Sequence, residues 1–184
     1  MSNRVKTGRV RASFLNVIIP RAAQEGQPPK YSVALLISKK DKKTLDELKS
    51  AIADAIEIDR AGKNHLKGVK TPKNPLHDGD GEKPNGGEYG PECAGCYVLN
   101  ASCKDQPGLV DRDNNVMKEK GEWYSGIYVR ADITFAAYNT AGSKGVGCFL
   151  NHLKKLADGE PLSGAGNPEL AFNDDYEDED EDII

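Results

Sequence analysis

Two early segments of the chain alternate apolar and polar side chains, and the segment after them changes period. Residues 8–19 predict a half-buried β-strand, and residues 30–38 predict a second strand that is buried on both faces, because Leu36 interrupts its polar side. Residues 42–61 then place apolar side chains three and four positions apart, which predicts an amphipathic helix. In the first strand, Val10, Ala12 and Phe14 are expected on the core face, and Arg9, Arg11 and Ser13 on the outer face. The expected caps of the helix are Asp41 and Gly62.

Three further extended segments follow a long irregular loop over residues 63–92. They cover residues 95–104, 124–138 and 146–156, and the middle one has the clearest alternation. The order of strand, strand, helix, long loop and three strands predicts a mainly β domain over residues 1–162. It fits a five-stranded, partly open barrel with a helix after the second strand.

Charge is divided unevenly along the chain. The formal net charge is −4, from 25 Lys and Arg against 29 Asp and Glu. Residues 173–184 hold eight of the acids and no base, which leaves 21 of the 29 acids against all 25 bases, a net charge of +4. A basic body with an acidic tail indicates a nucleic-acid or other charged partner.

Basic and aromatic side chains are interleaved on the predicted outer faces of the strands. A protein that holds unpaired nucleic acid without reading its sequence needs cations for the phosphates and rings on which bases stack. Two alternatives stay open, because outward Tyr and Arg are common on strands and Trp123 could instead cap the barrel. The residues expected to contact nucleic acid are Arg9, Arg11, Tyr97, Lys104, Arg112, Trp123, Tyr124, Tyr128, Arg130 and Tyr138.

Cofactor and metal chemistry find little support in the sequence. Cys93 and Cys96 have the spacing of one zinc-binding pair, but the second pair is missing, so zinc is left open and not expected. The acids of residues 77–82 lack the full spacing of a calcium loop. We find no arrangement of nucleophile, base and acid, and we expect neither an enzyme nor a cofactor. No apolar run approaches the ~20 residues of a membrane span, and no secretion signal is present, so we expect an intracellular protein with reduced thiols.

Several short stretches, taken in order, resemble the small phage single-stranded DNA-binding proteins. They are Thr7-Gly8-Arg9-Val10-Arg11, Lys30-Tyr31-Ser32-Val33 through Ile37, Asp78-Gly79-Asp80, Gly95-Cys96-Tyr97-Val98-Leu99-Asn100-Ala101, Tyr124-Ser125-Gly126-Ile127-Tyr128-Val129-Arg130-Ala131 and Lys144-Gly145-Val146-Gly147. The resemblance covers most of residues 7–162. It implies a Greek-key OB-fold barrel, a role in phage DNA replication or recombination, and a location in the cytoplasm of the infected host cell.

Residues 163–184 are expected to form a flexible linker and an acidic tail. The resemblance implies that the tail recruits replication proteins such as a polymerase, a primase-helicase or recombination proteins. The tail residues expected to bind a partner are Asp178, Glu179, Asp180, Glu181, Asp182, Ile183 and Ile184. An alternative function is a protein–protein adaptor or chaperone that works through this tail. The oligomeric state is left open, with a homodimer among the alternatives.

Overall fold

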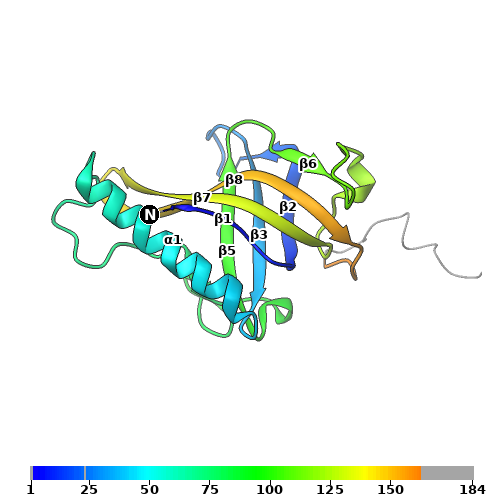
Figure 1. The fold of residues 1–184 in the computed structure, drawn as a ribbon, viewed down its shortest axis with the longest axis horizontal. Helices are drawn as coiled ribbons and strands as arrows, with labels where there is room; N and C mark the ends of the chain where they lie inside the picture. Colours follow the sequence, from blue (N-terminus) through cyan, green and yellow to red (C-terminus); the bar gives the residue numbers. More distant parts are fainter. Residues whose placement is uncertain (1, 23, 163–184) are drawn as a thin grey trace, which may run out of the picture.

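The computed structural model describes residues 2–22 and 24–162, which form a ring of strands with one long helix beside it (Figure 1). The predicted helix over residues 42–61 is confirmed, and its N-cap Asp41 accepts a hydrogen bond of 3.2 Å from the backbone N–H of Thr44. The elements are β1 (Arg4–Lys6), β2 (Val10–Arg21), β3 (Lys30–Ser38), α1 (Lys42–Ala61), β4 (Leu76–Asp78), β5 (Cys96–Cys103), β6 (Gly108–Val110), β7 (Tyr128–Thr140) and β8 (Ser143–Ala157). Two short 3₁₀ turns span Pro91–Cys93 and Lys120–Glu122.

Five of these strands close a barrel. Around the ring, β7 pairs with β2, β2 with β3, β3 with β5, β5 with β8, and β8 again with β7. All of these pairs are antiparallel except β5–β8, which is parallel. The predicted five-stranded barrel with a helix after its second strand is therefore confirmed. The short strands β1, β4 and β6 add to its edges by pairing with β7, β5 and β8.

The barrel interior is filled by the side chains that the alternation assigned to it. On β7, Val129, Ala131, Ile133 and Phe135 are each at most 1% exposed. Full burial of a valine, isoleucine or phenylalanine side chain contributes about 1.5–3 kcal/mol. The apolar stripe of α1 packs into the same core through buried leucines and Ile52. The sequence pattern of this strand and of the helix therefore predicts most of the core.

The second barrel strand is buried on both faces, as predicted. Its inner face contributes Val33, Leu35 and Ile37 to the main core. Its outer face contributes Ala34 and Leu36 to a small second cluster, together with Cys93 and Val98. The loop that contains Cys93 thus covers part of β3 and β5 from outside.

The prediction that Phe14 faces the core is wrong. Its side chain is 68% exposed and its backbone φ is 46°. The register of β2 against β3 shifts between Ser13 and Asn16, which marks a β-bulge. A bulge adds backbone on one strand and re-aims a side chain, so simple alternation fails at this point.

The acidic residues near His77 have a structural partner. The Lys39 Nζ lies 2.7 Å from Asp78 Oδ1 and 2.7 Å from Asp80 Oδ2. The hydrogen bond from Lys39 lowers the pKa of both carboxyl groups. These ion pairs join the end of β3 to the turn after β4. They give Asp78 and Asp80 a structural role that does not involve a calcium ion. Among the described residues, no helix combines the length and apolar character that crossing a membrane requires.

Candidate nucleic-acid interface

One side of the barrel carries mainly small and polar side chains. It is the outward side of β2, β3 and β5, where these residues alternate with those that fill the core. In oligonucleotide-binding barrels, this face of the second and third strands is the one that binds the strand. The strand register sets nine residues in three rows, which we call the outer face: Arg11, Leu36 and Val98; Ser13, Ala34 and Asn100; Asn16, Ser32 and Ser102.

Two neighbouring hollows lie on the outer face. One has a volume of about 740 Å³, covers the row of Asn16 and is bounded by Arg21 and Lys30 at the β2–β3 loop. The other has a volume of about 590 Å³ and covers the row of Ser13, between Phe14 and the loop of residues 83–93. Because the two rows are adjacent, the hollows lie next to each other along β3. We call the two hollows together the outer-face groove.

Charge is distributed unevenly along the outer-face groove. The hollow at the β2–β3 loop is lined by two cations and no carboxylate. The other hollow is lined by Lys83 and also by Glu88 and Glu92. The end near Arg21 and Lys30 is therefore the better site for phosphate groups.

Aromatic rings flank the second hollow. Phe14 lines it with a largely exposed ring, and the facing wall carries Tyr89. The Nζ of Lys83 lies 5.8 Å from the ring centroid of Tyr89. An exposed ring beside a floor of serine, alanine and asparagine can stack on a base of any identity.

A stack of arginine and tyrosine stands beside the outer face. The Cζ of Arg9 lies 4.3 Å from the ring centroid of Tyr128, and the Cζ of Arg11 lies 5.8 Å from it. These three predicted contact residues are therefore brought together, as the sequence predicted. No carboxylate lies within salt-bridge distance of Arg9 or Arg11 in the described part of the chain.

Residues 158–162 cross this region as a strap and hold Arg11 in place. Arg11 donates from Nε to the carbonyl oxygen of Gly126 at 3.2 Å and from Nη2 to that of Glu160 at 2.6 Å. The hydroxyl of Tyr124 donates to Asp158 Oδ1 at 2.9 Å. Burial raises the pKa of Tyr124 to about 12. Tyr124 thus fastens the strap and does not offer a free ring at the outer face.

Trp123 lies in the core, contrary to its expected place on the surface. Its side chain is 5% exposed, and its Nε1 donates to the carbonyl oxygen of Met117 at 2.8 Å. The protein therefore packs against both faces of the ring. This agrees with the alternative stated above, in which Trp123 caps the barrel.

Two of the predicted tyrosines lie away from the outer face. Tyr97 packs against the main core, with Lys39 Nζ at 5.5 Å and Lys49 Nζ at 5.8 Å from its ring centroid. Tyr138 lies against Gly145 and Gly147 of β8. It lies ten positions after Tyr128 on β7, or roughly 33 Å of strand. A single short site does not include both ends of β7.

The remaining predicted cations divide between two places. Lys104 is exposed directly after β5, at the end where Tyr31 of β3 pairs with Cys103. It therefore lies near the Lys30 end of the outer-face groove. Arg112 is exposed in the turn after β6, which pairs with β8. Arg130 is exposed on β7 and donates from Nε to the carbonyl oxygen of Thr7 at 2.7 Å.

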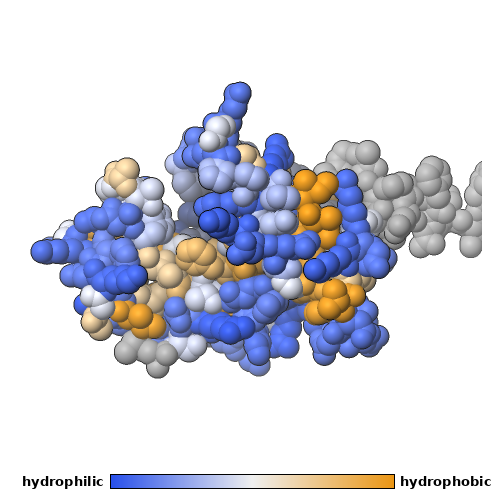
Figure 2. All heavy atoms as spheres, turned by 90° about the horizontal axis from the view of Figure 1, so that it is seen from above, coloured by the Kyte–Doolittle hydropathy of each residue, from blue (hydrophilic) through white to orange (hydrophobic). Residues whose placement is uncertain are grey.

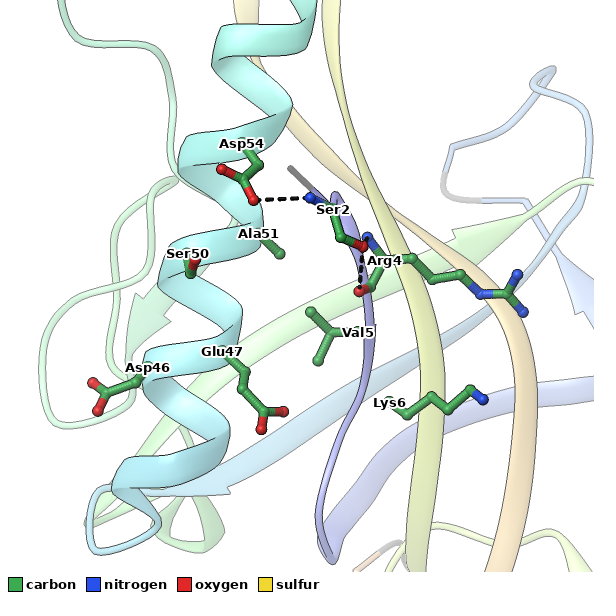
Figure 3. A pocket seen from close by; sticks show the side chains of 9 residues that line it. All are labelled: Ser2, Arg4, Val5, Lys6, Asp46, Glu47, Ser50, Ala51 and Asp54. Atoms are coloured by element: carbon green, nitrogen blue, oxygen red, sulfur yellow. Dashed lines mark hydrogen bonds between the residues drawn. The ribbon is translucent and has the colours of Figure 1, made fainter.

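The crevice between α1 and β1 has a mixed lining, with three carboxylates on α1 and the cations Arg4 and Lys6 on β1. Asp46, Glu47 and Asp54 line its helix side, and the Asp54 carboxylate accepts a hydrogen bond from the backbone N–H of Ser2 at 3.0 Å (Figure 3). Carboxylates repel phosphate groups, so we exclude this crevice from the interface despite its volume of about 690 Å³.

The cysteines and acids give no metal site in the described residues. No group of three or more His, Cys, Asp or Glu side chains that could hold a metal ion occurs within residues 2–22 and 24–162. All four cysteines are free, and burial raises the pKa of Cys93 and Cys96.

Several groove residues were missed in the sequence. Arg21 and Lys30 flank the glycine- and proline-containing loop, and two bases at the ends of one loop were a usable signal. Lys83 and Tyr89 belong to a loop that packs on the barrel. The alternation of apolar and polar residues along the sequence does not indicate this packing. Phe14 was missed because its bulge is set by pairing with β3. The tail residues Asp178 to Ile184 lie outside the described residues.

A closed five-stranded barrel with a cationic, aromatic-flanked groove over its second and third strands defines an oligonucleotide-binding barrel protein. The face shown in Figure 2 is largely hydrophilic with scattered hydrophobic patches. The chain belongs to the family of the single-stranded DNA-binding protein of Enterobacter phage Enc34, whose family model matches residues 3–184.

Individual relatives extend over nearly the whole chain. A putative protein, p50, of Acyrthosiphon pisum secondary endosymbiont phage 1 is 28% identical over 179 residues, which are 94% of this chain and 93% of the relative. The single-stranded DNA-binding protein from bacteriophage Enc34, solved in complex with single-stranded DNA, has a TM-score of 0.69 and 26% identity, covering 88% of this chain and 90% of the other. The bacteriophage T7 protein gp2.5, with 16% identity, a TM-score of 0.58 and coverage of 89% and 97%, shares the fold. The expected OB-type fold and the resemblance to phage proteins are confirmed.

Proposed function

We propose that this protein binds single-stranded DNA without reading its sequence, and that the strand lies in the outer-face groove. The observation that carries the proposal is the groove itself. Its floor has small polar side chains, one end is cationic, and an exposed phenylalanine stands at the other. Membership of the Enc34 family supports the choice of ligand.

The chemistry of the groove explains why the protein would bind single-stranded DNA of any base sequence. Arg21, Lys30 and Lys104 are exposed cations for the phosphates, which are the same at every nucleotide. Stacking on Phe14 uses the face of a base, which all four bases share, and contributes about 1–3 kcal/mol per base. Arg9, Arg11 and Tyr128 extend the contacts at the strap. None of these groups selects a particular base edge.

The biological role is part of the same proposal. We infer that the protein protects unpaired strands during phage DNA replication or recombination, in the cytoplasm of the infected cell. Its acidic tail would recruit replication proteins, with Ile183 and Ile184 as an apolar end to the charged segment. The charge contrast between body and tail supports two separate tasks for these two parts of the chain.

The test is binding of a fluorescent oligo-dT to a matched pair of variants. Phe14→Ala removes the ring beside the groove, and Ile58→Ala removes an apolar side chain that is 43% exposed on α1. We expect Phe14→Ala to weaken binding roughly tenfold, the value of one lost stacking contact. Ile58→Ala should leave the affinity for a short oligonucleotide unchanged.

Salt dependence separates this function from that of an adaptor. The logarithm of the affinity should fall with the logarithm of salt concentration, with a slope of about −0.7 for each phosphate neutralised. No binding by the unmodified protein at low salt would reject single-stranded DNA as the ligand. Equal affinities for Phe14→Ala and Ile58→Ala would instead reject Phe14 and the outer-face groove.

A further inference from the structure

A second cationic surface lies on the other side of the barrel. It is a hollow of about 310 Å³ over β1, β7 and β8, and its lining includes Lys6, Arg130, His152 and Lys154. We call these four residues the β7 patch. The strand pairing sets Arg130 opposite Lys154, and the adjacent pair sets Lys6 opposite Asp132. The four residues of the patch are therefore placed by three neighbouring strands, while Val110 of β6 and Asn114 in the turn after it also line the hollow.

The cations of the β7 patch are available to a ligand. Lys6 and Arg130 are exposed, and Figure 3 shows the side chains of Arg4 and Lys6 extending from β1 across β7, away from α1. No carboxylate within the described residues lies within 4.0 Å of a charged nitrogen of Lys6, Arg130 or Lys154. Unpaired cations this close together repel one another, so an anion that binds there relieves that repulsion.

The carboxylate in the lining of the patch is already neutralised. Asp132 accepts hydrogen bonds from Arg4 Nε at 2.8 Å and from Arg4 Nη2 at 2.6 Å. The hydrogen bond from Arg4 lowers the pKa of Asp132. A bidentate pair leaves little charge on this carboxylate, so the hollow keeps its net positive character.

The β7 patch is continuous with the outer face. In the pairing of β2 with β7, Arg11 lies opposite Tyr128. Arg130 follows Tyr128 by two residues and so points to the same side of β7. A path of arginine and tyrosine side chains therefore runs from the outer-face groove around β2 and β7 to Lys154.

We propose that the β7 patch is a second phosphate-binding track, over which a long single strand continues after it leaves the outer-face groove. This inference rests on the proposed function. The ligand is the phosphate backbone, because the hollow is lined by cations and by no Phe, Tyr or Trp side chain. The site differs from the groove in its strands and in its side of the barrel, and short oligonucleotides do not need it.

The test removes two cations from the patch and two from elsewhere. Lys6→Gln/Lys154→Gln alters the patch, and Lys43→Gln/Lys63→Gln makes the same charge change at exposed residues at the two ends of α1. Each variant is titrated, with DNA in excess, against two lengths of oligo-dT. One has about 6 nucleotides, near the lower end of the ~4–16 nucleotides that one such barrel covers, and the other has about 32, well beyond the upper end.

We expect the salt slope for the long oligonucleotide to become shallower by about 1.4 in the patch variant, from two lost phosphate contacts. The short oligonucleotide and the α1 variant should show no such change. If the patch variant keeps the full slope on the long oligonucleotide, the second track does not exist, although groove binding stands. Loss of all binding by the unmodified protein would instead refute the proposed function.

A second measurement distinguishes DNA from an acidic peptide as the occupant. A synthetic peptide of residues 173–184 is titrated against the protein that lacks those residues. Binding of the peptide that disappears in Lys6→Gln/Lys154→Gln, together with unchanged DNA slopes, would assign the patch to the tail and overturn the DNA track. Absence of that effect, with the altered slope, supports the track.

Discussion

At the scale of single residues, Phe14 combines two features that rarely occur together. Its ring is 68% exposed, and its backbone has a φ of 46°. A non-glycine residue in this left-handed region costs about 1–2 kcal/mol. An exposed ring contributes little burial to offset that cost. Backbone strain that stability does not explain is often found at binding sites.

Phe14→Gly should therefore separate stability from binding. Glycine adopts the positive φ without strain, although it loses about 0.5–1 kcal/mol through greater freedom in the unfolded chain. We expect the free energy of unfolding in urea to stay the same or to rise by up to about 1 kcal/mol, while affinity for oligo-dT falls roughly tenfold. A loss of stability larger than about 1 kcal/mol would show that the ring supports the fold.

At the scale of an element, the C-terminal end of α1 is held by a buried carboxylate. Asp59 is 7% exposed, and its two oxygens each accept a backbone hydrogen bond of 3.0 Å, from His65 and from Leu66. His65 Nδ1 lies 2.6 Å from Asp59 Oδ1. Burial acts to raise the pKa of Asp59, but the hydrogen bonds from His65 and Leu66 outweigh it, so that the pKa is lowered.

Asp59→Asn should destabilise the protein by about 1.5–3 kcal/mol at neutral pH, because a charged acceptor is lost from a buried network. A lowered pKa in the folded state stabilises the protein above the usual value near 3.8, and this contribution disappears as pH falls through the lowered value. The difference in unfolding free energy between the two proteins should thus shrink below about pH 4. Urea titrations at several pH values measure it, and a difference that is constant with pH would rule out the carboxylate as its source.

The strap is a second element whose position depends on particular residues. Gly126 has a φ of 120°, and a Cβ added there would lie within van der Waals overlap of the carbonyl oxygen of Glu160. A Cβ added at Gly159 would likewise overlap the carbonyl oxygen of Gly126. Only glycine at both positions lets the strap come close enough for Glu160 to accept the hydrogen bond from Arg11.

At the scale of the whole molecule, charge is the property that connects body and tail. Removal of residues 173–184 changes the net charge from −4 to +4. We expect the shortened protein to bind oligo-dT more tightly, most of all at low salt, since the tail and DNA are both polyanions that the cationic body attracts.

A matched control removes Ile183 and Ile184 alone, which leaves the charge unchanged. That variant should bind DNA with unchanged affinity and lose affinity for replication proteins, if the apolar end is what they recognise. Equal DNA affinities for the full chain and the chain without residues 173–184 would refute competition between tail and DNA. Fluorescence titration of oligo-dT measures both variants.

The sequence alone determined the five strands of the barrel, the helix and their order, but not the short strands β1, β4 and β6. The alternation on β7 and the helical period of α1 are set by side chains a few positions apart, so local chemistry carries that information. The caps Asp41 and Gly62 and the charge contrast of the tail are equally local. The prediction that Arg9, Arg11 and Tyr128 gather on one surface followed from their phase on the strands.

Only the tertiary structure decided which side chains are exposed to a ligand and which are buried. Trp123 and Tyr97 are buried or half-buried by residues far from them in the chain, and Phe14 is turned outward by a bulge that exists only where β2 meets β3. The outer-face groove likewise requires the register of three strands. Burial and register depend on partners distant in sequence, and a single sequence read along its length contains no direct measure of them.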